Sequence, residues 1–547
     1  MKGSTIPLVS LFSILLFQVS WAWTTSASIQ DNFIQCLDNA SPAHPDIYTP
    51  NNSSFAFVLQ SYIRNRRFDT TTTPKPVAIV TAKNESHVQA TVVCAKKLGI
   101  ELRIRSGGHD YEGVSYVSQV PFVLLDMFNL RSFDINVKNE SAWVQAGATL
   151  GELYYAIAQK SKYHAFAAGV CPGLGVGGHI GGGGYGNLMR KYGVATDNVL
   201  DAQIVDAKGR ILNRESMGED LFWAIRGGGA SSFGVILSWK VKLVQVPATV
   251  TVFNVNRTLE QGATDIVSQW EQVADKLPNE LFIRMLLKTV NGSHEGEKTI
   301  DAAFLGMFLG GAKQLVKLMQ ERLPKLGFQQ SDAIEMSWLE SVLFWMDKPV
   351  GTPVESLLER ATKPGIFLKR KSDYVVEPIS KTGLEAIWKT MIELGDVMML
   401  WNPYGGIMSE ISETETAFPH RAGNIFKIQY STNWMVEGIE AANLYLNKTR
   451  KLFEAMTPYV SKNPRKAFLN YRDLDIGTSS NGNYEEAKVY GIKYFECNFD
   501  RLVRVKTMVD PDNFFRNEQS IPTLPSRKLY RYKEKSSISY DSVTSLG

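Results

Sequence analysis

Cys171-Pro-Gly-Leu-Gly-Val-Gly-Gly-His-Ile-Gly-Gly-Gly-Gly-Tyr-Gly186 is a segment in which more than half of the positions are glycine. Residues with so few side chains cannot build a hydrophobic core, but they can bring backbone N–H groups close to a large, flat ligand. A thiol, Cys171, lies at the entrance of the segment, and a phenol, Tyr185, lies near its end. We interpret the segment as a cradle for a cofactor, with a point of covalent attachment.

Two other interpretations of this segment are less favourable. Gly173, Gly175 and Gly178 have the spacing of the dinucleotide-binding fingerprint, which requires a strand before it and a helix that opens at its last glycine. Here His179-Ile180 and four more glycines follow, a composition that disfavours a helix, so a Rossmann fold is not expected. A flexible linker would carry serine and other polar residues rather than the Cys-Pro, valine, isoleucine and tyrosine found here.

The composition is that of an ordinary globular protein. The chain has 547 residues, of which 44% are hydrophobic and 21% are charged, and this length is sufficient for two or more domains. The net charge is +4, and the Lys- and Arg-rich tail 527–535 also contains tyrosine and glutamate. This charge gives no support for a nucleic-acid partner, and we expect none. We also expect a small-molecule substrate and a monomeric state.

Residues 1–28 have the features of a secretory signal peptide. Lys2 provides a positive charge, an apolar stretch runs from Ile6 to Trp23, and small residues follow at 25–28, as in cleavable signals. No later segment has the apolar length of a membrane span, so we expect no membrane anchor and a location in the secretory pathway, the extracellular apoplast or cell wall, or the vacuole. Eight glycosylation sequons agree with this route: Asn39, Asn51, Asn52, Asn84, Asn139, Asn256, Asn291 and Asn447.

The chain contains four cysteines: Cys36, Cys94, Cys171 and Cys497. A disulfide is expected in an oxidising compartment, and four cysteines allow three complete pairings. We favour Cys36–Cys94 because Cys171 lies in the glycine-rich segment, and we leave Cys497 free. No cluster of cysteine and histidine has the spacing of a zinc site, and we expect no metal.

A β-α-β unit is predicted before the glycine-rich segment. Pro76–Thr81 is rich in strand formers, Ser86 is the expected cap of a helix, and Leu102–Arg105 is a second strand. The turn that follows, Ser106–Gly113, is too glycine-rich for packing, and we expect it to leave His109 exposed. The alternative is a structural histidine, but a second glycine turn with one nucleophile in the same half of the chain favours function.

The remaining chain divides at about residue 248. The expected elements before this point are a strand at 122–125, a helix capped by Thr149 and extending through Ala158, a hairpin over 198–212 and a strand at 235–241. Beyond it, glycine turns become rare and amphipathic helices appear at 315–323 and 384–391, with a strand at 426–430. The predicted organisation is a first α+β domain over 29–247 with its core at about 72–247, a second domain over 248–469 with an antiparallel sheet covered by helices, a segment over 470–525, and a polar tail over 526–547.

Five motifs in this order resemble those of the plant berberine bridge enzyme-like flavoproteins, the family of cannabinoid synthases and monolignol oxidoreductases. They are Arg105-Ser-Gly-Gly-His-Asp-Tyr-Glu-Gly113, Cys171-Pro-x-x-Gly-Val-Gly-Gly-His179, Trp401-Asn-Pro-Tyr-Gly-Gly406, Asn470-Tyr-Arg-Asp-Leu-Asp475 and Asp510-Pro-Asp-Asn-Phe-Phe-Arg-Asn-Glu518. The resemblance extends from about residue 30 to 525, which is essentially the mature chain.

This resemblance implies an α+β fold of the vanillyl-alcohol-oxidase (PCMH) type, in which 470–525 returns to the FAD-binding domain. It implies FAD held bicovalently, with the 8α carbon on His109 and C6 on Cys171, and it places the family's disulfide at Cys36 and Cys94. The other expected cofactor-binding residues are Arg105, Ser106, Gly107, Gly108, Asp110, Gly175, Gly177, Gly178, His179 and Gly183.

The family's active-site residues are also all present. The resemblance assigns Tyr471 as the catalytic base, Lys427 as the cation that favours its phenolate, and Tyr111, Tyr185 and Gln429 as hydrogen-bonding partners. A tyrosine can act as a base if a cation lowers its pKa. Berberine bridge enzyme itself has a glutamate at the position of Gln429, so the departure argues against its ring closure and for the oxidation of an alcohol or phenol.

Two further departures lie around the flavin. Gly173-Leu174 replaces the family's common Thr-Val, and Ile180-Gly181 replaces Phe-Ser. Valine at the position of Leu174 resembles the oxidase members and leucine those that react poorly with oxygen, so Leu174 is the expected oxygen gate.

We therefore expect a secreted FAD-dependent oxidoreductase that oxidises a small plant phenolic or allylic alcohol by hydride transfer to bicovalently bound flavin, with O₂ as one candidate acceptor. Two alternatives stay open: an FAD-dependent cyclase, since related mulberry proteins catalyse Diels–Alder cycloaddition, and a flavin-binding protein without turnover, as among pollen allergens.

Overall fold

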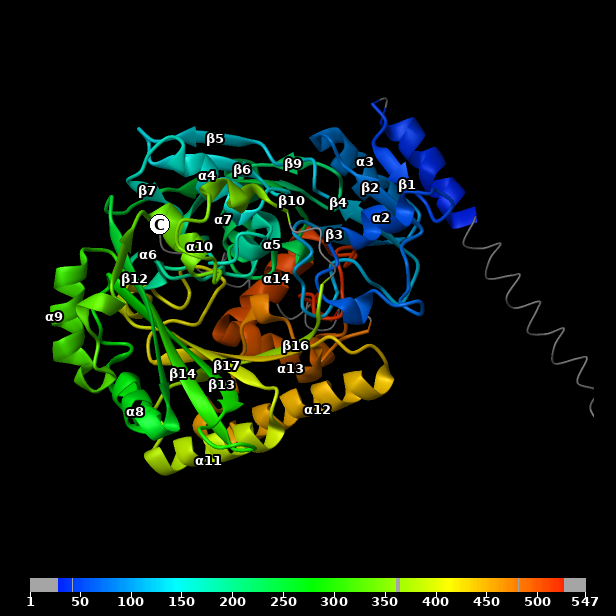
Figure 1. Cartoon of the computed structure of the whole chain (residues 1–547). Helices are drawn as coiled ribbons and strands as arrows, with labels where there is room; N and C mark the ends of the chain where they lie inside the picture. Colours follow the sequence, from blue (N-terminus) through cyan, green and yellow to red (C-terminus); the bar gives the residue numbers. More distant parts are fainter. Residues whose placement is uncertain (1–27, 42, 361–364, 481, 526–547) are drawn as a thin grey trace, which may run out of the picture.

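The computed structural model describes residues 28–41, 43–360, 365–480 and 482–525 (Figure 1). The expected signal peptide, apart from its last residue, and the polar tail 526–547 lie outside the described residues. Residues 28–40 form a helix, which precedes a small sheet with strand order β1-β2-β4-β3. Its elements are β1 (Asp46–Tyr48), α2 (Phe55–Gln60), β2 (Ala78–Thr81), α3 (Glu85–Lys97), β3 (Glu101–Arg105) and β4 (Phe122–Asp126).

Helix α3 connects β2 to β3 and completes the predicted β-α-β unit, with β4 inserted between the two strands and parallel to both. The helix begins two residues earlier than expected. Asn84, not Ser86, is the N-cap, and its side chain accepts a hydrogen bond from the backbone N–H of His87. Asparagine is at least as good an N-cap as serine. The helix therefore begins after Asn84, the first of the two candidate caps.

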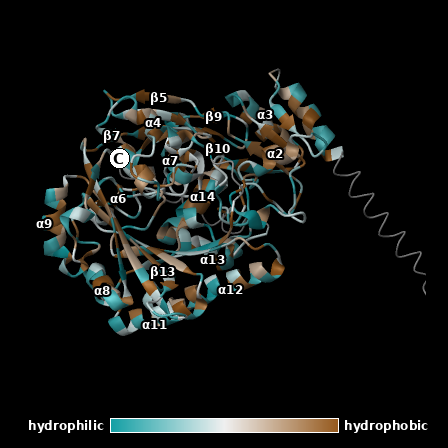
Figure 2. Cartoon of the chain, viewed as in Figure 1, coloured by the Kyte–Doolittle hydropathy of each residue, from teal (hydrophilic) through white to brown (hydrophobic). Residues whose placement is uncertain are grey.

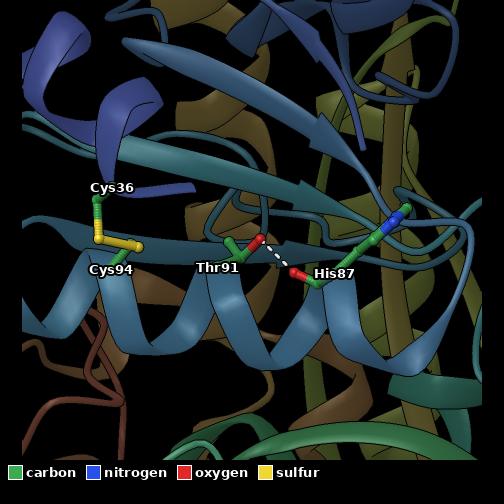
Figure 3. Close-up of a disulfide and its surroundings, with 4 residues drawn as sticks. All are labelled: Cys36, His87, Thr91 and Cys94. Atoms are coloured by element: carbon green, nitrogen blue, oxygen red, sulfur yellow. Dashed lines mark hydrogen bonds between the residues drawn. A yellow bond between two sulfur atoms is a disulfide. The ribbon is translucent and has the colours of Figure 1, made fainter. Parts of the chain in front are cut away.

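A disulfide anchors the N-terminal helix to α3 (Figure 3). It joins Cys36 to Cys94, the expected pairing, and closes a long loop, which stabilises the fold chiefly by restricting the unfolded chain. Cys171 and Cys497 carry free thiols, and that of Cys497 is exposed.

The second sheet is antiparallel, with strand order β5-β6-β10-β8-β9. Thr149 caps α4 through a reciprocal contact with Glu152, and the predicted hairpin pairs β8 with β9. The elements of this region are β5 (Phe133–Asn136), β6 (Ser141–Gln145), α4 (Leu150–Ala158), β7 (His164–Ala165), α5 (Val176–Gly181), α6 (Met189–Tyr192), β8 (Val199–Val205), β9 (Ile211–Leu212), α7 (Arg214–Ile225), β10 (Val235–Lys242) and β11 (Val244–Gln245).

Helix α5 lies inside the glycine-rich segment, where no helix was expected. A side chain at Gly177 would be 3.0 Å from the backbone oxygen of Ala146, and one at Gly181 would be 3.0 Å from the Ala230 side chain. The backbone therefore packs directly against its neighbours, and this close tertiary packing offsets the poor helix propensity of glycine. The strand before it, β7, pairs antiparallel with β11, so the segment is not the opening of a parallel Rossmann unit.

The third sheet has seven antiparallel strands in the order β15-β12-β14-β13-β17-β18-β16. Helices α8, α11 and α12 cover the side away from the N-terminal half (Figure 1), and each carries both brown and teal residues in Figure 2, as expected of helices with one buried face. The elements are β12 (Val250–Thr258), α8 (Ala263–Val273), β13 (Leu281–Asn291), β14 (Lys298–Phe308), α9 (Ala312–Arg322), β15 (Ile334–Met336), α10 (Trp338–Phe344), β16 (Phe367–Val375), α11 (Lys381–Leu394), β17 (Met398–Pro403), β18 (Phe426–Trp434) and α12 (Ile439–Ala455).

The C-terminal helices α13 (Tyr484–Phe495) and α14 (Phe499–Val509) lie centrally in Figure 1, between the N-terminal half and the third sheet. The fully buried ammonium of Lys506 on α14 donates to the backbone oxygens of Ser232 and Phe515 and pairs with Asp510. The segment thus packs on the N-terminal half. The domain boundaries at 248 and 470 stay predictions.

One buried carboxyl group makes the stability of the third sheet sensitive to pH. Glu271 on α8 is 1% exposed, its Oε2 accepts a hydrogen bond from the backbone N–H of Ile379, and its Oε1 has no hydrogen-bonding partner among the described residues. Burial raises the pKa of Glu271 to about 8. Because folding raises the pKa of this carboxyl group, the protonated form of Glu271 stabilises the folded state. This contribution is fully present below about pH 4.5 and is lost as the pH rises to about 8.

We therefore expect Glu271→Gln to have about the stability of the wild type near pH 4.5, and to be more stable by about 4–5 kcal/mol at pH 8 and above. The measurement is the melting temperature of both proteins at pH values from 4.5 to 9. A difference that does not change with pH would show that Glu271 titrates in its ordinary range.

Candidate active site

Three glycine-rich segments, at 106–113, 171–186 and 226–234, contribute to the wall of one cavity of about 450 Å³. This cavity is also lined by residues of the third sheet. The N-terminal half contributes the turn 106–111, the segment 169–185 and the turn 229–234. The third sheet and the loop after α12 contribute Arg284, Leu400, Gln429, Phe468, Leu469, Asn470, Tyr471 and Arg472, and the segment after α10 contributes Trp345 and Met346.

Both predicted attachment residues line this cavity. His109 is half-buried rather than exposed, because the turn that carries it is covered by the segment 171–175: a side chain at Gly173 would be 3.2 Å from His109 Nε2. Burial, together with Arg64, lowers the pKa of His109 to about 3, so its imidazole is neutral at physiological pH. Burial raises the pKa of the Cys171 thiol. The backbone N–H groups of Gly173 and Leu174 and the charge of Arg64 act in the opposite direction.

Most of the predicted cofactor-binding residues line the cavity: Ser106, Gly107, Gly108, Asp110, Gly175, Gly177, Gly178 and His179. Arg105 and Gly183 do not. Arg105 is completely buried, pairs with Asp126 and donates to the backbone oxygens of Val58 and Leu59. Gly183 has a φ of +114° and packs against Phe418, where a side chain would not fit. Both glycine motifs thus serve packing as well as the cavity.

The cavity suits a large ligand bound close to the backbone. His109 Nε2 is buried and has no hydrogen-bonding partner among the described residues, which is unusual for a buried polar atom. A side chain at Gly178 would meet no protein atom within 4 Å, so open space lies beside a glycine of the cavity wall. An unpaired nucleophile, a free thiol and open space beside glycines fit an attached flavin.

Four of the predicted catalytic residues line the same cavity and contact one another in pairs. The hydroxyl groups of Tyr185 and Tyr471 share a short hydrogen bond, and the Tyr111 hydroxyl accepts a hydrogen bond of 2.9 Å from Gln429 Nε2. The Tyr111 and Tyr471 rings lie 5.8 Å apart. Burial and the phenols of Tyr185 and Tyr111 raise the pKa of Tyr471 well above its ordinary value, whereas Arg284 acts in the opposite direction.

Lys427, the predicted cation, lies close to the ring of Tyr471 and forms no hydrogen bond with its hydroxyl. Its Nζ lies behind the cavity wall, 3.2 Å from the centroid of the Tyr185 ring, 3.7 Å from that of Phe468 and 4.5 Å from that of Tyr471. The atom is buried without a hydrogen-bonding partner among the described residues, and burial and Arg284 lower the pKa of Lys427. Its contact is therefore with the faces of aromatic rings, and chiefly with Tyr185.

Arg284 is a site residue that sequence reasoning missed. It lies on β13, lines the cavity and is 8% exposed. Its Nε donates to Asn402 Oδ1 at 2.7 Å, and its Nη2 lies 3.4 Å from the Tyr185 hydroxyl oxygen. No motif surrounds Arg284 in the sequence. The pairing of β13 with β17 brings it beside Asn402, with which it forms a hydrogen bond.

The expected oxygen gate, Leu174, lines the cavity and is half-buried. Ile180, the other departure nearby, is completely buried and does not reach the cavity. His179 accepts a hydrogen bond from the Gly169 backbone at Nε2, and burial lowers its pKa to about 3. Within the described part of the chain, no cluster of three acidic, cysteine or histidine residues could bind a metal ion, and no helix is long and apolar enough to cross a membrane.

All eight sequon asparagines are exposed in the structure. Asn256 differs from the others because it lies within β12 and its amide donates to both carboxylate oxygens of Asp301. Glycosylation at these positions stays a prediction.

Comparison with known proteins agrees with this geometry. Residues 76–214 match the model of the FAD binding domain, and residues 467–522 match that described as berberine and berberine like. Berberine bridge enzyme-like 14 of Arabidopsis thaliana is 56% identical to this chain over 96% of the chain and all of its own length. Both matched segments contribute residues to the cavity.

Solved structures share the fold. Berberine bridge enzyme from Eschscholzia californica has a TM-score of 0.85 and 36% identity, and covers 90% of this chain and 99% of its own. Phl p 4, a grass pollen allergen with glucose dehydrogenase activity, has a TM-score of 0.85 and 43% identity over the same shares. A variant of Phl p 4 with one isoleucine-to-valine substitution is a glucose oxidase. The fold is therefore the α+β fold with a PCMH-type FAD-binding region, and the chain belongs to the berberine bridge enzyme-like family of FAD-binding oxidoreductases.

Proposed function

We propose that this protein is a secreted oxidoreductase that oxidises a small plant phenolic or allylic alcohol, with FAD attached to both His109 and Cys171. The observation that supports the proposal is the set of residues that line the cavity. Two nucleophiles, His109 and Cys171, line it. A hydrogen-bonded pair of phenols, flanked by Arg284 and Lys427, lines it as well.

Bound flavin would supply the two-electron oxidant that accepts a hydride from the substrate. The neutral imidazole of His109 and the thiol of Cys171 would hold it. Attachment at two points fixes the orientation of the ligand, so that the protein needs only to align the substrate and remove its hydroxyl proton.

The phenol pair is suited to taking that proton. We assign the phenolate form of Tyr471 as the group that accepts it, with Tyr185 as the partner that donates a hydrogen bond to that phenolate, so its negative charge would be shared between two oxygens before the proton arrives. Because burial raises the pKa of Tyr471, this role requires a positive charge close to the pair. Arg284, whose Nη2 lies near the Tyr185 hydroxyl, would stabilise that charge, because charged groups interact more strongly in a buried site than in water. Lys427 lies over the Tyr185 ring and would add to this effect in its protonated form, which burial and Arg284 disfavour. Tyr111 and Gln429, joined by their own hydrogen bond, would orient the substrate hydroxyl.

A panel of phenolic alcohols, allylic alcohols and sugars tests the substrate class. Sugars belong in the panel because the structural neighbour Phl p 4 acts on glucose. Each compound is mixed with the enzyme without oxygen while the flavin absorbance is recorded. We expect bleaching by phenolic or allylic alcohols; bleaching by sugars alone would overturn the assigned substrate class.

We expect slow reaction of the reduced enzyme with O₂ and at least tenfold faster reoxidation in Leu174→Val. The change removes one methylene from the cavity wall, enough to open a passage for a diatomic molecule without disturbing the fold. The conversion of Phl p 4 to an oxidase by a change of the same size supports the prediction. The measurement follows flavin absorbance after the reduced enzyme is mixed with oxygenated buffer.

The matched control is Ile180→Val, since Ile180 does not reach the cavity. Fast reoxidation of the wild type, or no effect of Leu174→Val on a slow wild type, would exclude Leu174 as the gate.

A further inference from the structure

Three residues next to Tyr471 in the sequence bind other parts of the fold. Their partners lie in the N-terminal half or on the edge strand of the third sheet. Asn470 precedes Tyr471 in its loop, and Arg472 and Asp473 follow it. The side chains of these three residues leave the loop toward three different partners, so Tyr471 is held from both sides.

Asn470 binds the glycine-rich segment that begins at Cys171. Its Oδ1 accepts the backbone N–H of Gly184 at 3.0 Å, and its Nδ2 donates to the backbone oxygen of Gly178 at 3.3 Å. A side chain at Gly182 would be 2.3 Å from the Asn470 amide, so this glycine is required for the approach. The loop is therefore fixed to one of the two predicted attachment segments.

Arg472 binds the other attachment segment. Its Nε donates to Asp110 Oδ2 at 3.0 Å, and Asp110 is the residue directly after His109. The same carboxylate organises the turn, because its Oδ1 accepts the backbone N–H groups of Glu112 and Val114.

The third link passes through Lys369, on the edge strand β16. Its Nζ lies 2.5 Å from Glu112 Oε1 and 2.7 Å from Asp473 Oδ1. Lys369 is 1% exposed, Glu112 5% and Asp473 2%. Glu112 follows Tyr111 directly, so the acidic residues on both sides of Tyr111 are tied to the two residues that follow Tyr471.

We propose that Lys369, with Glu112 and Asp473, is an ionic clamp that positions Tyr471 and Tyr111 relative to the two attachment segments. None of the three clamp residues lines the cavity, so they are positioning residues that act through the tyrosines. The inference rests on the proposed roles of Tyr111 and Tyr471. A buried ion pair contributes little net stability, but it can fix a geometry, and small misplacements of reacting groups cost roughly 10²-fold in rate.

The decisive variant is the double substitution Lys369→Met with Glu112→Gln. It removes one positive and one negative charge together. Asp473 keeps Lys371 as a partner, Asp475 keeps Lys371 and Arg450, and Arg67, which loses Glu112, is partly exposed. Lys369→Met alone would leave Glu112 with only its longer contact to Arg67, and loss of folding there would not bear on positioning. The control is Asp373→Asn, on the same strand and fully buried, which breaks a pair with Arg465 away from the cavity.

Three quantities are measured on the flavin-loaded proteins: the melting temperature, the visible circular dichroism of the bound flavin, and the rate of flavin reduction at saturating substrate. In the double variant we expect a melting temperature within a few degrees of the wild type, an altered dichroism spectrum, and reduction slowed by roughly 10²-fold. Asp373→Asn should keep the wild-type spectrum and rate.

A wild-type spectrum and rate in the double variant would overturn the clamp and leave the cluster a purely structural feature. The clamp would also be overturned if the rate of flavin reduction fell in every variant, Asp373→Asn included, only as far as its melting temperature fell. Failure of the proposed function is seen separately, as an unchanged reduction rate in Tyr471→Phe, whereas the dichroism spectrum reports the clamp without turnover.

Discussion

Replacing Tyr471 with phenylalanine should slow reduction of the bound flavin by roughly 10²–10⁴-fold, the usual contribution of a positioned proton acceptor. The substitution removes only the hydroxyl that bonds to Tyr185 and keeps the ring that packs against Tyr111, Tyr185 and Phe468. The pair would then lose the oxygen that is assigned to accept the substrate proton, and only the Tyr185 hydroxyl would remain. The rate is measured by anaerobic mixing of the flavin-loaded variant with substrate.

Tyr490→Phe is the matched control. Tyr490 is completely buried and donates to the backbone oxygen of Ser520, away from the cavity. We expect it to lower the melting temperature slightly and to leave the reduction rate unchanged. Wild-type reduction by Tyr471→Phe would remove Tyr471 from the mechanism.

The double variant His109→Ala, Cys171→Ala should lose its flavin to the supernatant when the protein is precipitated with acid. The wild type should stay yellow after washing, and each single variant should stay yellow through its remaining link. The expectation follows from the structure because both nucleophiles line the same cavity and His109 Nε2 lacks any other partner among the described residues.

Cys497→Ala serves as the control for thiol loss, since Cys497 is exposed and does not line the cavity. Free FAD released from precipitated wild type would contradict covalent attachment, and a yellow double variant would place the links on other residues.

Local sequence signals predicted much of the fold. The Thr149 cap, the hairpin over 198–212 and the amphipathic helices at 315–323 and 384–391 each form where short-range patterns placed them. The α3 start was wrong because two good caps, Asn84 and Ser86, compete within one turn. Helix α5 was missed because its stability depends on packing partners such as Ala146 and Ala230, which lie far away in sequence.

The site was predicted as a set of residues but not as a geometry. The residues that the motifs singled out, among them His109, Cys171, Tyr185 and Tyr471, line one cavity in the structure. Burial of His109, the approach of Lys427 to the Tyr185 ring and the presence of Arg284 all depend on how the sheet meets the glycine-rich segments. Strand pairing such as that of β13 with β17 sets these contacts, and no local pattern encodes it.

The central claim, oxidation of an alcohol by enzyme-bound flavin, is tested most directly by a single turnover without oxygen. Enzyme in excess is mixed with a substrate found in the panel, and bleached flavin and product are both quantified. The account predicts one oxidised product for each flavin bleached. Product formed without bleaching would contradict it in favour of cycloaddition, and neither product nor bleaching across the panel would indicate a flavin-binding protein without turnover.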